Sequence, residues 1–275
     1  MSGTRNFRLP CLGLVLTAVL LLISGCSGEE MDSATGESAG QTPGREPATG
    51  YEVIQAMHER YSERWYETLV FEQEVVEYRA SGTDSSVWYE AMKIPGRLRI
   101  DMNQPASGNG YIFRGDSLYV FADGALSVAQ PTLHPLLLLG FDVYRADPSR
   151  TAARLDSAGF DLSSVSQASW QGRDVYVVGG GPGEVGKAQF WIDRERLVFV
   201  RMLQPVGEDA SATSEVQFNN YEPLGDGWIA PEVLFFYNGT PTMTERYSNV
   251  QIDVPLDEAL FSPGRALETE HWLSY

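Results

Sequence analysis

The residues that most often carry chemistry are few in this chain and widely separated. The 275 residues include two cysteines and three histidines. His58 precedes Glu59, but no second histidine completes an H-E-x-x-H zinc motif. Gly181, Gly183 and Gly186 spell G-x-G-x-x-G, yet the residues that follow alternate as in a strand, whereas a dinucleotide-binding loop opens a helix. We therefore expect a glycine-rich hairpin loop here, and a protein that has no metal, no cofactor and no enzymatic activity.

The chemistry that the sequence does support is at Cys26. Arg5 and Arg8 precede an apolar run at residues 11–23, a pattern typical of a secretory signal peptide. Residues 23–26, Ile-Ser-Gly-Cys, resemble the bacterial lipobox. The resemblance implies a signal peptide over residues 1–25, cleavage before Cys26, and acylation of its thiol and new amino group with chains such as palmitate. A chance cysteine in an ordinary signal peptide is the alternative.

The residues after Cys26 predict where the anchor lies. Ser27 is not an aspartate, so the common signal for retention in the inner membrane is missing, which implies the outer membrane. Residues 26–48 are rich in Gly, Ser, Thr, Glu and Pro, a composition that cannot bury enough apolar surface to fold. We expect a lipidated cysteine and flexible tether at residues 26–48, followed by one domain at residues 49–275.

The charge of the chain limits its partners. The formal net charge is −17 and the isoelectric point is near 4.5. Nucleic-acid binding needs a basic field that collects phosphates, and an anionic membrane attracts basic segments. We therefore expect no nucleic-acid partner, and we expect membrane attachment through the N-terminal lipid anchor.

The most unusual apolar stretch is at residues 131–141, Pro-Thr-Leu-His-Pro-Leu-Leu-Leu-Leu-Gly-Phe. It is too short to span a bilayer, which takes about 20 apolar residues. Pro135 suits the first turn of a helix and Gly140 suits its C-terminal cap. One interpretation is a helix in the core; the other is a lid over an apolar, lipid-binding cavity.

Turn-rich sequence with short strands surrounds this stretch. Thr49 and Glu52 form the capping-box pattern of a helix. Apolar residues then recur at helical spacing on one face: Ile54, Met57, Tyr61 and Trp65. Asp147 and Pro148 begin a second helix that ends before Gly159. About eleven strands with short antiparallel connections make up the rest, which predicts one antiparallel sheet, strongly curved or closed.

One predicted strand has faces of opposite character. In residues 97–102, Leu, Ile and Met alternate with Arg, Arg and Asp. Successive side chains of a strand point to opposite faces, so we expect one dry face toward an apolar interior and one charged face toward solvent.

Several segments together resemble the bacterial Lol family of lipoprotein carriers and receptors (LolA and LolB type). These are K-I-P-G-R-L-R-I at residues 93–100, D-S-L-Y-V-F at 116–121, T-L-H-P-L-L at 132–137, F-W-I-D at 190–193 and L-D-E-A-L-F-S-P at 256–263. The resemblance covers roughly residues 50–264. Two features depart from the soluble carriers: Cys26 implies an anchor, and residues 221–238 are longer, as in lipoprotein-sorting-like proteins of unassigned cargo.

The resemblance implies an α+β fold, with a curved antiparallel sheet forming an incomplete β-barrel that helices cover over an apolar cavity. The cavity would bind acyl chains of lipoproteins or lipids for sorting or transport, at the outer membrane and facing the periplasm. A periplasmic carrier or an inner-membrane transporter would be the protein partner. We expect these residues to contact the chains: Leu98, Ile100, Met102, Val120, Leu136, Leu137, Leu138 and Phe141.

Two alternatives stay open at this point. The same fold occurs in regulators of the cell envelope that bind a protein partner, so the chain could be a sensor. A structural lipoprotein whose side chains fill its own cavity is the other possibility.

Overall fold

The structure, a computed structural model, describes residues 45–104, 107–207 and 210–274. The strands before the leucine-rich stretch are β1 Thr68–Arg79, β2 Gly82–Lys93, β3 Arg97–Met102, β4 Gly110–Arg114, β5 Ser117–Ala122 and β6 Ala125–Pro131. Those after it are β7 Val165–Trp170, β8 Arg173–Val178, β9 Gln189–Asp193, β10 Phe199–Val206, β11 Ala212–Asn219, β14 Glu232–Tyr237 and β15 Thr240–Ile252. A separate two-stranded hairpin contains β12 Glu222–Leu224 and β13 Gly227–Ile229.

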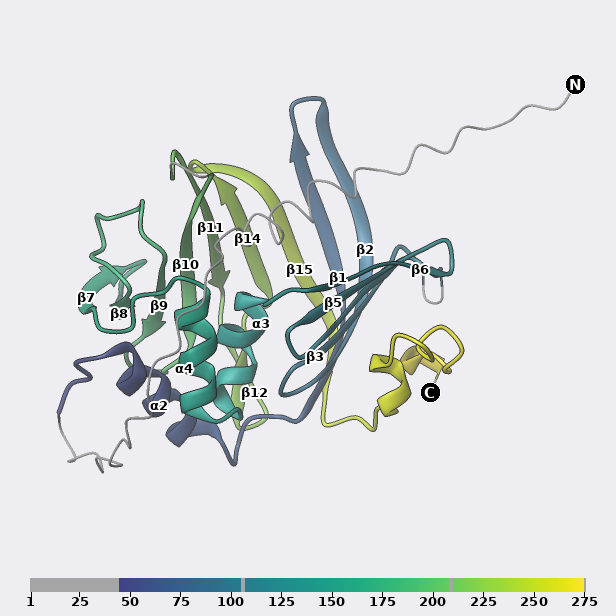
Figure 1. Ribbon diagram of the computed structural model, residues 1–275, viewed down its shortest axis with the longest axis horizontal. Coiled ribbons are helices and arrows are strands. Elements are labelled where there is room, and N and C mark those ends of the chain that lie inside the picture. Colours follow the sequence, from purple (N-terminus) through teal and green to yellow (C-terminus); the bar gives the residue numbers. More distant parts are fainter. Residues whose placement is uncertain (1–44, 105–106, 208–209, 275) are drawn as a thin grey trace, which may run out of the picture.

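Within the described residues, thirteen strands form one antiparallel sheet that curves without closing (Figure 1). The spatial order is β6-β5-β4-β3-β2-β1-β15-β14-β11-β10-β9-β8-β7. Long strands lie in the middle, where β1 pairs with both β2 and β15. This arrangement confirms the predicted α+β fold with an incomplete barrel.

The connection between the two edges of the sheet is helical. The chain leaves the edge strand β6, passes through α3 Pro135–Gly140, the 3-10 turn η1 Asp142–Tyr144 and α4 Pro148–Ser157, and enters the opposite edge strand β7. Together with α2 Gly50–Tyr61, these helices lie on the concave side of the sheet (Figure 1).

Both predicted helix starts are confirmed by their caps. Thr49 Oγ1 accepts a hydrogen bond from the Glu52 amide at 3.2 Å, and the Glu52 carboxylate accepts one from the Thr49 amide at 3.3 Å. At α4, Asp147 Oδ1 accepts from the Arg150 amide at 2.9 Å. The predicted apolar stripe is buried, although α2 ends before Trp65, whose ring instead stacks in the core.

The number of strands was underestimated. The sequence predicts about eleven, whereas the described residues hold thirteen in the sheet and two in the small hairpin. Strand β6 was not predicted, because it is an exposed edge strand. Strands β12 and β13 have only three residues each. The glycine-rich stretch at residues 179–188 is a loop followed by strand β9, as predicted.

Part of the outer face of the sheet is covered by the C-terminal segment. This segment contains the 3-10 turns η2 Glu258–Phe261 and η3 Trp272–Ser274, and it lies across the sheet from the helices (Figure 1). Val70 of β1 and Ala91 of β2 point outward and pack with Leu260, Phe261 and Trp272 in a small buried cluster. The parts of β1 and β2 around Val70 and Ala91 are therefore buried on both faces.

Candidate functional site

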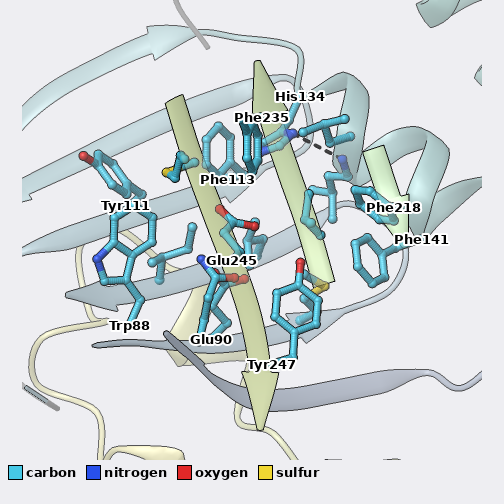
Figure 2. Close-up of a pocket in the computed structure, with 18 of the residues that line it drawn as sticks. Trp88, Glu90, Tyr111, Phe113, His134, Phe141, Phe218, Phe235, Glu245 and Tyr247 are labelled. Atoms are coloured by element: carbon cyan, nitrogen blue, oxygen red, sulfur yellow. Dashed lines mark hydrogen bonds between the residues drawn. The ribbon is translucent and has the colours of Figure 1, made fainter. Parts of the chain in front are cut away.

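The concave face of the sheet encloses an apolar cavity of about 110 Å³ beside α3 (Figure 2). Strands from both halves of the sheet and the helix α3 contribute to it. The residues that line it are Gln73, Trp88, Glu90, Met92, Leu98, Ile100, Tyr111, Phe113, Leu118, His134, Leu136, Leu137, Phe141, Phe218, Val233, Phe235, Met243, Glu245 and Tyr247.

The alternation of the strands selects which side chains reach the cavity. On β2, Trp88, Glu90 and Met92 line it, while Ala91 packs under the C-terminal segment. On β3, Leu98 and Ile100 line it. Successive side chains of a strand point to opposite faces of the sheet. A shift of one residue along the strand therefore moves a side chain from the cavity to the outer face.

The helix α3 forms one wall of the cavity. It begins as predicted, with Pro135 in its first turn and His134 as its N-cap, whose Nδ1 accepts a hydrogen bond from the Leu137 amide at 3.2 Å. Leu136, Leu137 and Phe141 line the cavity. Consecutive residues of a helix are about 100° apart, so four leucines in a row cannot all face one side.

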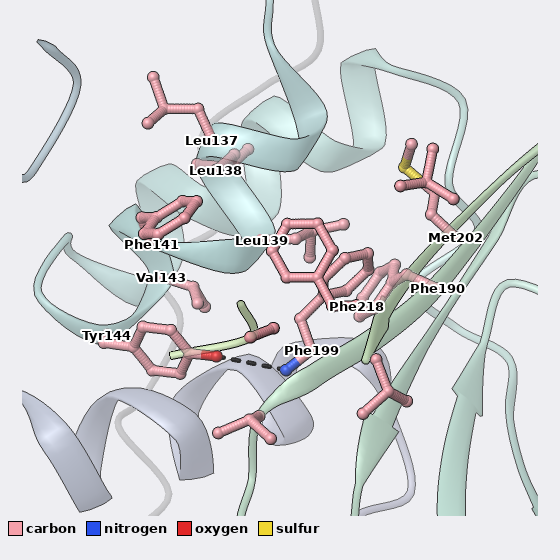
Figure 3. Packing of buried hydrophobic residues seen from close by; sticks show 14 of the residues in the cluster. Leu137, Leu138, Leu139, Phe141, Val143, Tyr144, Phe190, Phe199, Met202 and Phe218 are labelled. Carbon is pink, nitrogen blue, oxygen red and sulfur yellow. Dashed lines mark hydrogen bonds between the residues drawn. The ribbon is translucent and has the colours of Figure 1, made fainter. Parts of the chain in front are cut away.

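The remaining leucines of α3 face the core. Leu138 and Leu139 are buried in the main hydrophobic cluster (Figure 3). In the same cluster, the Phe199 amide donates a hydrogen bond to the Tyr144 hydroxyl at 3.2 Å. The helix therefore packs against the core on one face and borders the cavity with the other. It has the position expected of a core helix and also the position expected of a helix over an apolar cavity.

The prediction that Gly140 caps this helix was wrong. Gly140 is the last helical residue, and Phe141 is the C-cap. A Cβ atom on Gly140 would lie 2.8 Å from Cε2 of Phe218, closer than packed carbon atoms approach. The glycine is required here by close contact between α3 and β11.

Three polar side chains from adjacent strands lie together in the cavity. We call Gln73 of β1, Glu90 of β2 and Glu245 of β15 the acidic row. The register of the two strand pairings makes Gln73 a diagonal neighbour of both glutamates, so the row crosses three adjacent strands. The exposed fractions are 1 % for Gln73, 5 % for Glu90 and 9 % for Glu245.

Burial changes the protonation of both carboxyls. Burial raises the pKa of Glu245 to about 8, although Gln73 and Tyr247 partly oppose this by favouring the carboxylate. Burial and the neighbouring Glu245 raise the pKa of Glu90 well above its usual value. No lysine or arginine of the described residues forms an ion pair with either carboxyl. With a pKa of about 8, Glu245 is mostly protonated at neutral pH, and neither carboxyl has a counter-charge from the described chain.

Two donors in the cavity have no acceptor. Gln73 Nε2 and Trp88 Nε1 are buried and make no hydrogen bond with any described residue. Gln73 is close enough to Glu245 to lower its pKa, but no hydrogen bond of normal geometry joins them. His134 supplies no positive charge at neutral pH, because burial lowers its pKa to about 4. A buried donor without a partner costs about 1–3 kcal/mol, so this polarity needs an explanation.

The described residues contain neither a metal-binding cluster nor a membrane-spanning helix. No group of three or more His, Cys, Asp or Glu side chains in this part of the chain is arranged to hold a metal ion. Among the helices that the structure describes, none has the length and apolar character needed to cross a membrane.

Comparison with solved structures identifies the fold. Over 79 % of its length the chain matches 98 % of a Vibrio parahaemolyticus domain described as an outer membrane lipoprotein-sorting protein, with a TM-score of 0.56 and 14 % identity. It matches 96 % of a DUF1329 family protein from Desulfovibrio piger over 78 % of its length, with a TM-score of 0.55 and 15 % identity. It also matches 97 % of a LolA superfamily protein from Nitrosomonas europaea over 76 % of its length, with a TM-score of 0.50 and 15 % identity. The chain has a LolA-like fold.

The sequence alone does not lead to the same relatives. No family model and no curated protein matches the chain. At 14–15 % identity, the solved structures show that the LolA-like fold is shared. The chemistry of the cavity must therefore be derived from the side chains of this chain.

Five of the eight predicted contact residues line the cavity of this LolA-like fold: Leu98, Ile100, Leu136, Leu137 and Phe141. Three do not. Leu138 faces the core because of the helical rotation, and Val120 is buried in the core two residues beyond Leu118 on β5. Met102 is at the last position of β3, two residues beyond Ile100, and is only partly buried. Cys26, the predicted lipid attachment site, lies outside the described residues.

The predicted charged, solvent-facing side of β3 was wrong. Arg99 and Asp101 are only 3 % and 7 % exposed, because the C-terminal segment covers them. Arg99 Nε donates to Asp101 Oδ1 at 3.0 Å and Arg99 Nη2 to Asp101 Oδ2 at 2.9 Å. His271 Nε2 lies 3.1 Å from Asp101 Oδ2, and its ring stacks on Trp272 at 3.8 Å. We call Arg99, Asp101 and His271 the outer cluster.

The acidic row was not predicted from the sequence, although a signal was present. In Trp88-Tyr89-Glu90-Ala91-Met92, the glutamate occupies the same strand phase as the apolar Trp88 and Met92. A charged residue in the inward phase of a strand is unusual and indicates either a buried partner or a site. For Glu245 the neighbouring sequence gives a weaker alternation, so only the strand pairing brings it beside Glu90.

Proposed function

We propose that this protein binds the acyl chains of lipoproteins or lipids in its concave cavity and acts in their sorting or transport. The observation that supports this most directly is an apolar cavity bounded by the inner face of an open sheet and by one side of α3. Burying apolar surface contributes about 25 cal/mol per Å², so a chain several carbons long gains affinity without a charged clamp. The likeness to a lipoprotein-sorting domain and to a LolA superfamily protein supports the same class of ligand.

The size of the cavity indicates how a long chain enters. Its volume of about 110 Å³ is smaller than the cavity of about 150 Å³ that accommodates benzene in an engineered protein core. A complete acyl chain is larger than benzene, so it needs additional space. Leu136, Leu137 and Phe141 form the wall that α3 contributes, and a displacement of α3 widens the cavity. In this proposal α3 is the lid.

We further propose that the chain is anchored through acylated Cys26 to the outer membrane and faces the periplasm. Its sequence supports this through the apolar run at residues 11–23 and the lipobox-like residues 23–26. Several acyl chains on one cysteine give stable membrane attachment where a single chain does not. A periplasmic carrier or an inner-membrane transporter would deliver the cargo, and no nucleic acid takes part.

We propose a binding protein and not an enzyme. The polar groups of the cavity are two carboxyls, one amide, the His134 imidazole and the polar atoms of its tyrosine and tryptophan rings, among many apolar side chains. Binding accounts for this lining without any covalent step.

Native mass spectrometry with lipid extraction tests the proposal on the full chain recovered from the cell envelope. We expect an acylated species that co-purifies at near-stoichiometric amounts and can be exchanged for added lipid. A protein whose mass never includes a ligand, even after incubation with lipids and acylated peptides, would contradict it.

A pair of matched variants locates the binding site. Leu137→Glu places a charge in the cavity wall, and we expect loss of nearly all bound lipid because an unpaired charge is not accommodated among apolar groups. Leu126→Glu makes the same change at a leucine of β6 that is 49 % exposed, and we expect normal loading. Equal lipid content in the two variants would argue against the cavity as the binding site.

A further inference from the structure

The acidic row lies in an apolar cavity, and the binding of an acyl chain alone does not require carboxyl groups there. Glu90 and Glu245 are carboxyls inside an apolar cavity, and no cation of the described chain neutralises them. A buried charge is normally paired, or the group remains protonated at a cost in its own solvation. A cavity that only held hydrocarbon would be served better by apolar residues at both positions.

The groups around the row point to the kind of ligand. Gln73, only 1 % exposed, keeps its Nε2 donor without a partner and is placed to stabilise Glu245 once that carboxyl ionises. Aromatic side chains border the same space: Trp88, Tyr111, Phe113, Phe141, Phe218, Phe235 and Tyr247 (Figure 2). Aromatic faces attract organic cations, and carboxylates pair with them.

We propose that the acidic row binds an ammonium group, so that the cavity takes amphiphiles carrying one positively charged amine on an apolar chain. The inference rests on the proposed function, because the apolar part of the ligand occupies the cavity described there. It goes beyond that function by stating which polar end the cavity accepts. An anionic end, such as a carboxylate, meets no described cation and keeps both carboxyls from ionising, so we expect it to bind more weakly than an ammonium.

Binding is coupled to the release of a proton. The ammonium favours the ionised form of the row, so a carboxyl loses its proton to solvent as the ion pair forms, and no other bond changes. The titratable groups that line the cavity are Glu90 on β2, Tyr111 on β4, His134 before α3, and Glu245 and Tyr247 on β15. His134 is neutral at pH 7 because burial lowers its pKa to about 4, and burial raises the pKa of both tyrosines, so the two carboxyls are the source of the proton.

Three ligands of equal chain length test the inference: hexylammonium, hexan-1-ol and hexanoate. Their affinities are measured by isothermal titration calorimetry on the full chain, with the same non-ionic detergent present throughout. At pH 7 we expect hexylammonium to bind about tenfold more tightly than hexan-1-ol, as a desolvated cation–π and ion-pair contact predicts, and hexanoate to bind most weakly. Titrations in buffers of different ionisation enthalpy should detect proton release with hexylammonium and none with hexan-1-ol.

The double variant Glu90→Gln, Glu245→Gln serves as the matched control. We expect it to lose the preference for hexylammonium and the proton release, while it binds hexan-1-ol as before, which also shows that it is folded. Equal affinities of the unchanged chain for all three ligands, or a preference for hexanoate, would overturn the inference and leave the proposed function standing. Absence of binding for all three, together with no co-purifying lipid, would instead remove the proposed function.

Discussion

The two faces of the same sheet bury charged residues in opposite ways. On the outer face, Arg99 and Asp101 share two hydrogen bonds, and Arg99 Nη1 also donates to the Ala266 carbonyl oxygen at 2.8 Å. On the concave face, Glu90 and Glu245 have no ion pair with any described residue. Only one residue of β3 separates the two environments, because Ile100 lies in the cavity between Arg99 and Asp101.

The pKa shifts of the carboxyls have opposite directions for the same reason. Burial acts to raise the pKa of Asp101, but His271 and Arg99 outweigh burial and hold it below its usual value. Burial raises the pKa of Glu245 to about 8 because nothing comparable opposes it. A buried charge that has an oppositely charged partner holds two segments of the chain together. A buried carboxyl without such a partner lowers the stability of the fold and indicates a site where a ligand supplies the partner.

Removal of the arginine from the outer cluster should have the largest effect on stability. Arg99→Met leaves the Asp101 carboxylate buried without its main partner, and we expect a loss of about 4 kcal/mol in the free energy of unfolding at pH 7. Urea denaturation measures it. The double variant Arg99→Met, Asp101→Leu removes both charges and should be more stable than the single variant. If the stability of Arg99→Met lay within about 1 kcal/mol of that of the unchanged chain, Arg99 would not be the group that neutralises Asp101.

Removal of a carboxyl from the concave face should have the opposite sign. The unfolded chain releases the Glu245 proton near pH 4.3, whereas the folded chain holds it until about pH 8, so this group lowers stability as pH rises between the two values. Glu245→Gln should therefore be more stable than the unchanged chain by only about 1 kcal/mol near pH 5 and by about 3 kcal/mol or slightly more at pH 7. Urea denaturation from pH 5 to pH 9 measures the difference. A difference that does not grow with pH would contradict the uncompensated carboxyl.

The smallest effect should come from the third member of the outer cluster. His271→Ala removes the contact with Asp101 at 3.1 Å and the stacking on Trp272. Because Arg99 still pairs with Asp101, we expect a loss of about 1 kcal/mol in the free energy of unfolding. Differential scanning calorimetry measures it, with His58→Ala on α2 as the comparison. A loss as large as that of Arg99→Met would mean that His271 is the main partner of Asp101.

Local chemistry made much of the fold predictable. The caps at Thr49 and Asp147, the proline at the start of α3 and the two-residue alternation of the strands all depend on neighbours close in sequence. Each is set by a hydrogen bond or a steric preference within a few residues. The start of α3 was predicted at this level, and the five predicted contact residues that line the cavity lie in segments whose local structure was predicted in the same way.

What was missed depends on pairing across long stretches of sequence. Arg99 and Asp101 alternate with apolar residues like any half-exposed strand, and only contact with a segment some 170 residues later buries them. Glu90 and Glu245 become neighbours because β1 pairs with both of their strands. The periodicity of a single strand shows which side chains share a face of the sheet. It does not show which other segment of the chain covers that face, so these contacts could not be predicted from it.

The helical connection between the sheet edges has a mechanical consequence. Strands β6 and β7 are the two edges of the open sheet, and α3, η1 and α4 join one to the other. Flattening the sheet separates its edges and extends this connection, while tighter bending slackens it. Because this connection carries α3, we expect a change in the curvature of the sheet to shift α3 as well, which would alter the width of the cavity.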